Sequence, residues 1–115
     1  MTFAHLVRSV RGLLGDGAKP ISQQRLSDLL GVSWSTVARW EGGQAPDANV
    51  RVRLERVLLV IELLGEMVRP EHRLPFLEQR NPQLLRLRPI DLLATDEGFE
   101  AVSELLEGVA SGAFG

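Results

Sequence analysis

The segment from Ala48 to Met67 constrains the fold most, because it is apolar on nearly every side of a helix. Its aliphatic side chains fill one helical face and much of the rest: Val50, Leu54, Val57, Leu58, Leu59, Val60, Ile61, Leu63 and Leu64. A helix with so little polar surface has to be buried from several directions. We therefore expect this segment to form either the spine of the fold or the seam of a homodimer.

The rest of the chain also has helical periodicity, and no stretch alternates apolar and polar residues for long enough to predict a strand. Helices are predicted over residues 3–14, 23–30, 34–41 and 89–94, and a last helix runs from the cap Thr95 to about Val109. Short helical pieces are expected between Pro70, Pro75, Pro82 and Pro89, where proline interrupts longer helices. These patterns predict an all-α fold.

Composition excludes several classes of protein. The 115 residues include no cysteine, which excludes disulfides, thiolate catalysis and cysteine-based zinc sites. The longest apolar run, Val57 to Ile61, is shorter than a membrane span, and the N-terminus carries no export signal, so we expect a cytoplasmic protein without membrane association. His5 and His72 are far apart and have no ligand spacing to carboxylates, so we expect no enzyme, metal or cofactor.

Charge is distributed unevenly along the chain, although the formal net charge is only −2. Residues 51–90 carry eight arginines against five glutamates, whereas residues 91–115 carry six acidic residues and no basic one. Such a division suggests two activities with different partners. The alternative is a solvated acidic helix without a special role.

Residues 22–41 have the layout of a helix-turn-helix, with Ser22 and Ser33 as N-caps and a turn at Gly31. On the second helix, Val37 and Trp40 share the inward side. Ser35, Ala38 and Arg39 lie opposite, and Trp34 stands at the exposed N-terminal corner. A recognition helix needs such an arrangement, with polar groups facing base edges. The alternative is that this is plain helix packing without DNA binding, because residues 1–50 carry little positive charge to neutralise phosphates. If the segment does bind DNA, Arg51, Arg53 and dimerisation could supply the missing phosphate affinity.

The run from Ile21 to Gly43 resembles the Xre (Cro/CI-type) helix-turn-helix, and the resemblance covers about residues 3–65. The residues expected at base edges are Trp34, Ser35, Thr36 and Arg39, and those expected at the DNA backbone are Ser22, Gln23, Ser33 and Gln44. The resemblance also implies that Glu41 pairs with Arg11 or Arg8 of the first helix. The connection from Gly15 to Pro20 is longer than is usual in this family.

The proline, leucine and threonine-glycine elements between Asn81 and Gly112 resemble a second module, the toxin-binding domain of Xre/MbcA/ParS-type antitoxins, over about residues 70–115. A departure is Leu85-Arg86-Leu87, where the family usually has glycine before its Arg/Ser-Pro step. The resemblance implies a RES-domain toxin as partner, an NAD-directed enzyme of ADP-ribosyltransferase-like fold whose active-site entrance the C-terminal segment covers. The residues expected to bind the toxin are Glu100, Glu104, Glu107, Ser111, Gly112, Ala113, Phe114 and Gly115.

Together these features predict two domains, a five-helix-type helix-turn-helix domain over residues 1–68 and a small helical toxin-binding domain over residues 69–115. The expected function is that of a type II antitoxin that neutralises its toxin and, as a homodimer on operator DNA, represses its own operon. One alternative is a stand-alone transcriptional regulator whose C-terminal half only dimerises. Another is an interaction module with a vestigial helix-turn-helix.

Overall fold

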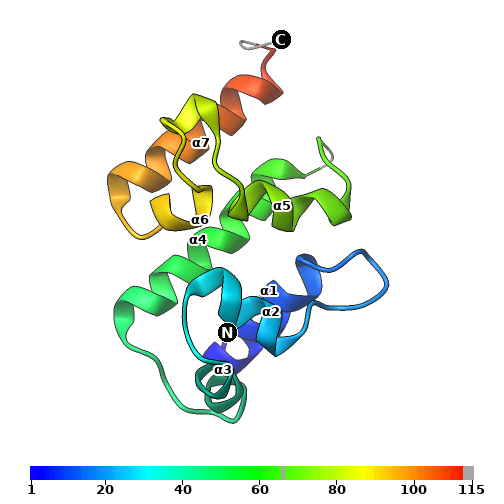
Figure 1. The fold of residues 1–115 in the computed structure, drawn as a ribbon, viewed down its shortest axis with the longest axis vertical. Coiled ribbons are helices and arrows are strands. Elements are labelled where there is room, and N and C mark those ends of the chain that lie inside the picture. The colour runs from blue at the N-terminus through cyan, green and yellow to red at the C-terminus, as the bar shows by residue number, and fades with distance from the viewer. Residues whose placement is uncertain (66, 113–115) are drawn as a thin grey trace.

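The computed structural model describes residues 1–65 and 67–112, and within them all regular structure is helical (Figure 1). The helices are α1 (Phe3–Leu13), α2 (Gln23–Leu30), α3 (Trp34–Glu41), α4 (Ala48–Leu64), α5 (Arg73–Glu78), α6 (Pro89–Leu92) and α7 (Asp96–Ala110), with 3₁₀ turns η1 (Pro70–His72) and η2 (Pro82–Leu84). The described residues contain no strand, only an isolated bridge between Asn81 and Leu87. The all-α prediction is confirmed.

The predicted caps set the starts of three helices. The side chains of Ser22, Ser33 and Thr95 accept hydrogen bonds from the backbone N–H groups of the third residue of α2, α3 and α7. Each bond satisfies an N–H that has no partner inside its own helix. Gly31 ends α2 in the left-handed region at φ 74°, where glycine has no steric penalty. Local sequence thus fixes these boundaries.

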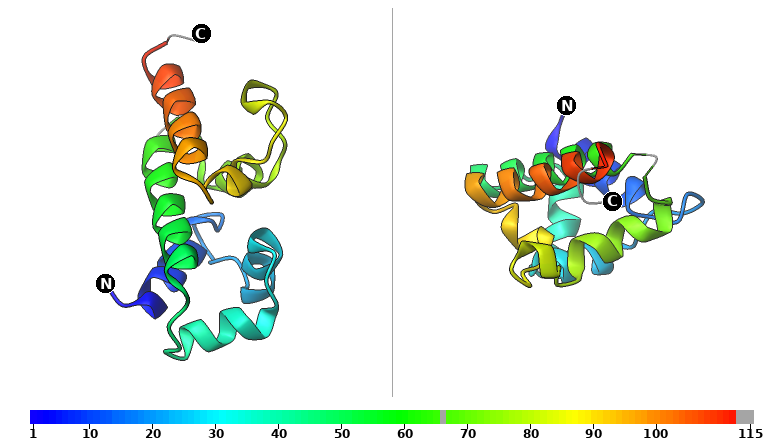
Figure 2. Two further views of the ribbon diagram at one scale, coloured as in Figure 1. Left: turned by 90° about the vertical axis from the view of Figure 1, so that its left-hand side faces the viewer. Right: turned by 90° about the horizontal axis from the view of Figure 1, so that it is seen from above.

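Helix α4 is the spine of the fold. It packs against α1 at one end and against α7 along its other half, as the side view in Figure 2 shows. Its buried side chains are Leu54, Val57, Val60, Ile61 and Leu64. Part of the helix is left uncovered in the single chain, where Val52 and Leu59 remain 42% and 45% exposed. The helix also ends at Leu64 rather than Met67, since Gly65 leaves the helical region (φ 42°, ψ −123°).

A single hydrophobic cluster connects the two halves of the molecule. It runs from Phe3 and Val10 of α1, through Leu54 and Ile61 of α4, to Leu106 of α7. Within the N-terminal half, Phe3 and Trp40 pack edge to face with ring centroids 5.4 Å apart, a geometry that aromatic pairs favour. The predicted domain boundary at residue 68 lies between α4 and α5, in the middle of this continuous packing, and remains a prediction.

The loop before α6 keeps a left-handed turn although it contains no glycine. Leu85 and Arg86 have φ values of 59° and 63°, in a region that costs a non-glycine residue about 1–3 kcal/mol. Backbone hydrogen bonds hold the turn, from Arg86 N to Asn81 O (2.9 Å) and from Asn81 N to Leu87 O (3.1 Å). This turn therefore forms without the glycine that the sequence resemblance led us to expect there.

Candidate functional site

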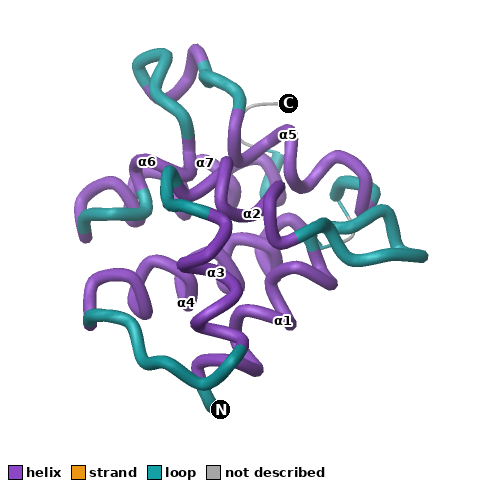
Figure 3. The backbone as a smooth tube through the Cα atoms, turned by 60° about the horizontal axis from the view of Figure 1, so that its bottom comes forward, coloured by secondary structure: helices purple, strands orange, loops and turns teal. Residues whose placement is uncertain are grey.

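Helix α3 packs on both α2 and α1 at one end of the molecule, which comes forward in Figure 3. Val37 and Trp40 of α3 are buried, together with Leu26 and Leu29 of α2. On the opposite side of α3, Ser35 and Arg39 are exposed. The inward and outward faces predicted for α3 are therefore confirmed.

The residues expected at base edges all lie on α3, with Trp34, Ser35 and Thr36 in its first turn and Arg39 in its last turn. Trp34 is 52% exposed, although indole is usually largely covered in a monomer. The Arg39 guanidinium donates to Thr36 Oγ1 at 3.3 Å, and Ser33 Oγ lies 2.8 Å from the same hydroxyl. Thr36 is half-buried, and its hydroxyl is already hydrogen-bonded to the Ser33 and Arg39 side chains, so it holds these side chains in place rather than facing solvent. Trp34, Ser35 and Arg39 form the outward group of this face.

The residues expected at the DNA backbone lie at helix ends. Ser22 and Ser33 are exposed, and their hydroxyl oxygens already accept from Arg25 N (3.0 Å) and Thr36 N (3.2 Å). Gln23 is half-buried in the first turn of α2, and Gln44 is exposed just after α3. All of these except Gln44 stand beside a helix N-terminus, where the macrodipole favours an anion.

Ion pairs join α1 to α3 behind this face. Glu41 Oε1 accepts from Arg11 at 2.6 Å, and its other oxygen lies 3.6 Å from Arg8. Arg11 and Glu41 are only 19% and 11% exposed, so they are screened less than a surface pair. Arg11 also donates to Ile21 O at 2.8 Å, which closes the long connection after α1. The expected partner of Glu41 is confirmed, and both arginines contact it.

The connection between α1 and α2 has its own internal turn. The Asp16 carboxylate accepts from the backbone N–H groups of Ala18 (3.0 Å) and Lys19 (3.1 Å). These bonds lower the pKa of Asp16, because they favour its charged form. The long connection from Gly15 to Pro20 is thus folded into a turn. It does not prevent Arg11 from pairing with Glu41.

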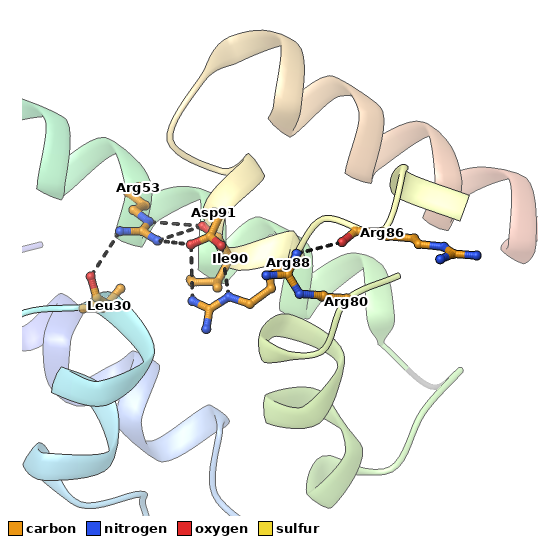
Figure 4. Close-up of polar contacts among 7 residues, drawn as sticks. All are labelled: Leu30, Arg53, Arg80, Arg86, Arg88, Ile90 and Asp91. Atoms are coloured by element: carbon orange, nitrogen blue, oxygen red, sulfur yellow. Dashed lines mark hydrogen bonds and ion pairs between the residues drawn. The ribbon is translucent and has the colours of Figure 1, made fainter. Parts of the chain in front are cut away.

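Arg53 has a structural role that the sequence did not indicate. Its guanidinium donates to Ile90 O at 3.1 and 3.0 Å and to Leu30 O at 3.4 Å, and lies 3.6 Å from Asp91 (Figure 4). Burial lowers the pKa of Arg53, and the nearby Asp91 opposes that shift. We expected Arg53 to add affinity for phosphate. In the structure its guanidinium instead links the end of α2 to α6.

Other arginines are used in the same way. Arg56 donates to Leu93 O at 3.0 Å and pairs with Asp96, and Arg25 pairs with Glu78. Arg73 donates to Leu13 O at 2.9 Å, whereas the half-buried Arg51 pairs with Glu55 on the same helix at 3.0 Å. Arg53, Arg56 and Arg73, three of the eight arginines in residues 51–90, therefore hold the two halves of this chain together.

The predicted toxin-binding glutamates lie together on α7. Glu100, Glu104 and Glu107 are all exposed, as are Ser111 and Gly112 at the end of this helix. Ala113, Phe114 and Gly115, the remainder of the predicted binding segment, lie outside the described residues. The structure therefore brings the acidic part of the prediction onto one face.

Helix α4 forms the other wall of this acidic face. A cavity of about 560 Å³ lies between α4 and α7, with the three glutamates along its α7 side. Leu59, Glu62 and Leu63 of α4 line the opposite side. The sequence did not indicate a role for these three residues in the site, because the apolar segment that contains them predicted either the spine of the fold or the seam of a homodimer.

No catalytic arrangement is evident among the residues described. His5 and His72 are exposed on α1 and η1. Over residues 1–65 and 67–112, no group of three or more His, Cys, Asp or Glu side chains could hold a metal ion. In the same part of the chain, every helix is too short or too polar to cross a membrane.

Comparison with known proteins gives a likeness among solved structures. No protein-family model matches the chain. No curated protein matches it either. Among solved structures, the chain is similar to a chain of the crystal structure of the M. tuberculosis MbcT–MbcA toxin–antitoxin complex, with 25% sequence identity and a TM-score of 0.68. The match covers 95% of this chain and 94% of that chain, so it extends over α1 to α7 rather than over one motif.

Proposed function

We propose that this protein is the antitoxin of a type II toxin–antitoxin system. The observation that carries the proposal is the likeness to a chain of a toxin–antitoxin complex over nearly the whole length of both chains. The finer parts of the proposal come from the sequence resemblance: the toxin is a RES-domain enzyme directed at NAD, and the helix-turn-helix represses the shared operon. The chain itself acts by binding, with no chemical step of its own.

In this proposal the acidic face of α7 and the segment after it engage the toxin. Glu100, Glu104 and Glu107 supply a negative surface, which accelerates encounter with a positive partner and disfavours wrong partners. Residues 111–115 complete the contact at the active-site entrance. Most of the affinity comes from the helices, which are already formed before binding.

Co-expression with the product of the neighbouring gene tests the antitoxin role. We expect the neighbour to arrest growth, the wild-type chain to restore growth, and the two proteins to co-purify. The triple variant E100K/E104K/E107K is expected to lose both rescue and complex formation, because it reverses the charge of the face. E71K is the control for charge reversal at a single site away from this face, since Glu71 is an exposed glutamate on η1. A harmless neighbour that does not bind would reject the proposal.

A DNA-binding role for α3 is the second part of the proposal, favoured by the exposed group Trp34, Ser35 and Arg39. The chain is proposed to bind operator DNA as a homodimer, which matches the two-fold symmetry usual for such operators. If the DNA contacts are strong and the neighbouring gene is harmless, the stand-alone regulator becomes the better description.

Arg39→Ala is expected to lower affinity for the promoter fragment upstream of the gene by about 10- to 100-fold, since a bidentate contact to guanine is worth about 1–3 kcal/mol. Arg39 is exposed and bonds only weakly to Thr36, so the fold should be unaffected. Arg86→Ala, which removes the same charge from an exposed loop, is the control for total charge. Gel shifts measure both variants, and equal affinities for R39A and wild type would contradict base reading by α3.

A further inference from the structure

The cavity between α4 and α7 has an apolar floor. Leu59 is 45% exposed there, although it belongs to the most apolar helix of the chain. Leu63 and Phe99 are half-buried beside it. Covering such side chains stabilises a complex by about 25 cal/mol for each Å² of apolar surface removed from water. The floor therefore suits a partner that inserts apolar side chains.

The rim of the same cavity is acidic, and the Arg56 guanidinium, which lies 5.5 Å from the centre of the Phe99 ring at the floor, pairs with Asp96 rather than with a rim carboxylate. Glu62, Glu100, Glu104 and Glu107 line it, and among the described residues none of them forms an ion pair. Several carboxylates outside this cavity pair with arginine, including Glu41 and Glu78. Glu100 and Glu104 are one turn apart on α7, where like charges destabilise a helix by a few tenths of a kcal/mol.

A polar atom between the glutamates is also without a partner. Ser103 Oγ is buried at the cavity wall and makes no hydrogen bond to any other described residue. A buried hydroxyl without a hydrogen bond costs about 1–3 kcal/mol. Because Ser103 as a whole is only half-buried, rotation of its side chain toward the cavity would let a bound partner accept or donate this hydrogen bond.

We infer that this cavity, which we call the α4–α7 groove, binds a basic amphipathic segment of the toxin, so that toxin binding extends from α7 onto α4. The inference rests on the proposed function and names its binding surface and the chemistry of the partner. Apolar side chains of the segment cover Leu59 and Leu63, and its arginines or lysines meet Glu62, Glu104 and their neighbours. A second copy of this chain fits less well, because two-fold pairing of the groove brings its carboxylates against each other.

The groove is tested with full-length variants on α4, outside the predicted toxin-binding residues. L59K and E62K are expected to weaken binding of the purified neighbouring-gene product at least 10-fold, and added salt should weaken the wild-type complex as well. V52K is the matched control for L59K, because Val52 is 42% exposed on the same helix and does not line the groove. E71K is the control for E62K. Thermal unfolding by circular dichroism verifies that each variant keeps the fold.

The outcomes separate the two proposals. If E104K loses binding while L59K and E62K bind as wild type, the toxin contacts α7 alone, so the groove inference fails and the antitoxin role stands. If the wild-type chain itself does not bind, the antitoxin role fails. Light scattering on the isolated chain tests whether a second copy of this chain occupies the groove. A dimer that both L59K and E62K dissociate would overturn the inference in favour of that second copy.

Discussion

Replacing Gly98 with alanine is expected to destabilise the protein by about 3 kcal/mol or more, at the upper end of the cost of overpacking a core. Gly98 is buried in the first turn of α7, where that helix packs on α6. A Cβ atom there would lie 2.0 Å from Leu92 O and 2.7 Å from Leu92 C. These are backbone atoms, so no side-chain rotation relieves the contact and α6 has to move away from α7.

Gly12→Ala is the matched control for this prediction. Gly12 lies inside α1, it is exposed, and nothing lies within 4 Å of a Cβ built on it. The same substitution there should stabilise the protein by about 0.5–1 kcal/mol, because alanine loses less backbone entropy than glycine in a helix. Urea denaturation followed by circular dichroism measures both variants. Equal midpoints for G98A and G12A would show that α6 and α7 do not pack as described.

Arg53→Met is expected to destabilise the protein by about 2–3 kcal/mol. Methionine keeps much of the aliphatic stem but removes the bonds to Ile90 O and Leu30 O, whose residues are buried. A buried carbonyl that loses its donor costs about 1–3 kcal/mol. The two losses are not expected to add fully, because water can reach part of a site in which Arg53 is itself 21% exposed.

Arg51→Met provides the comparison for Arg53. Arg51 lies two residues earlier on α4, and its exposed pair with Glu55 is worth only a few tenths of a kcal/mol. We expect R51M to unfold within about 0.5 kcal/mol of wild type. Chemical denaturation and gel shifts on both variants distinguish two roles for Arg53. An R53M protein of wild-type stability with reduced DNA affinity would support the original phosphate assignment and contradict the structural one.

The candidate site was predictable in part. The outward face of α3, with Trp34 and Arg39, follows from the position of each residue on one helix, and so does the line of glutamates on α7. The groove was not predictable, because it requires α4 and α7 to lie side by side. Leu59 and Glu62 belong to it through α7, which begins more than thirty residues later in the sequence.

By itself, the sequence determined the all-α fold and the starts of α2, α3 and α7, because caps and helical periodicity act over three or four residues. The tertiary structure decided which side of α4 stays uncovered and where the arginines of residues 51–90 make their bonds. Arg53 reaches a carbonyl 37 residues away, and charge alone cannot distinguish that partner from a phosphate. Burial and ion pairing depend on neighbours that only folding brings together. The contacts that hold the two proposed binding surfaces in place therefore could not be predicted from the sequence.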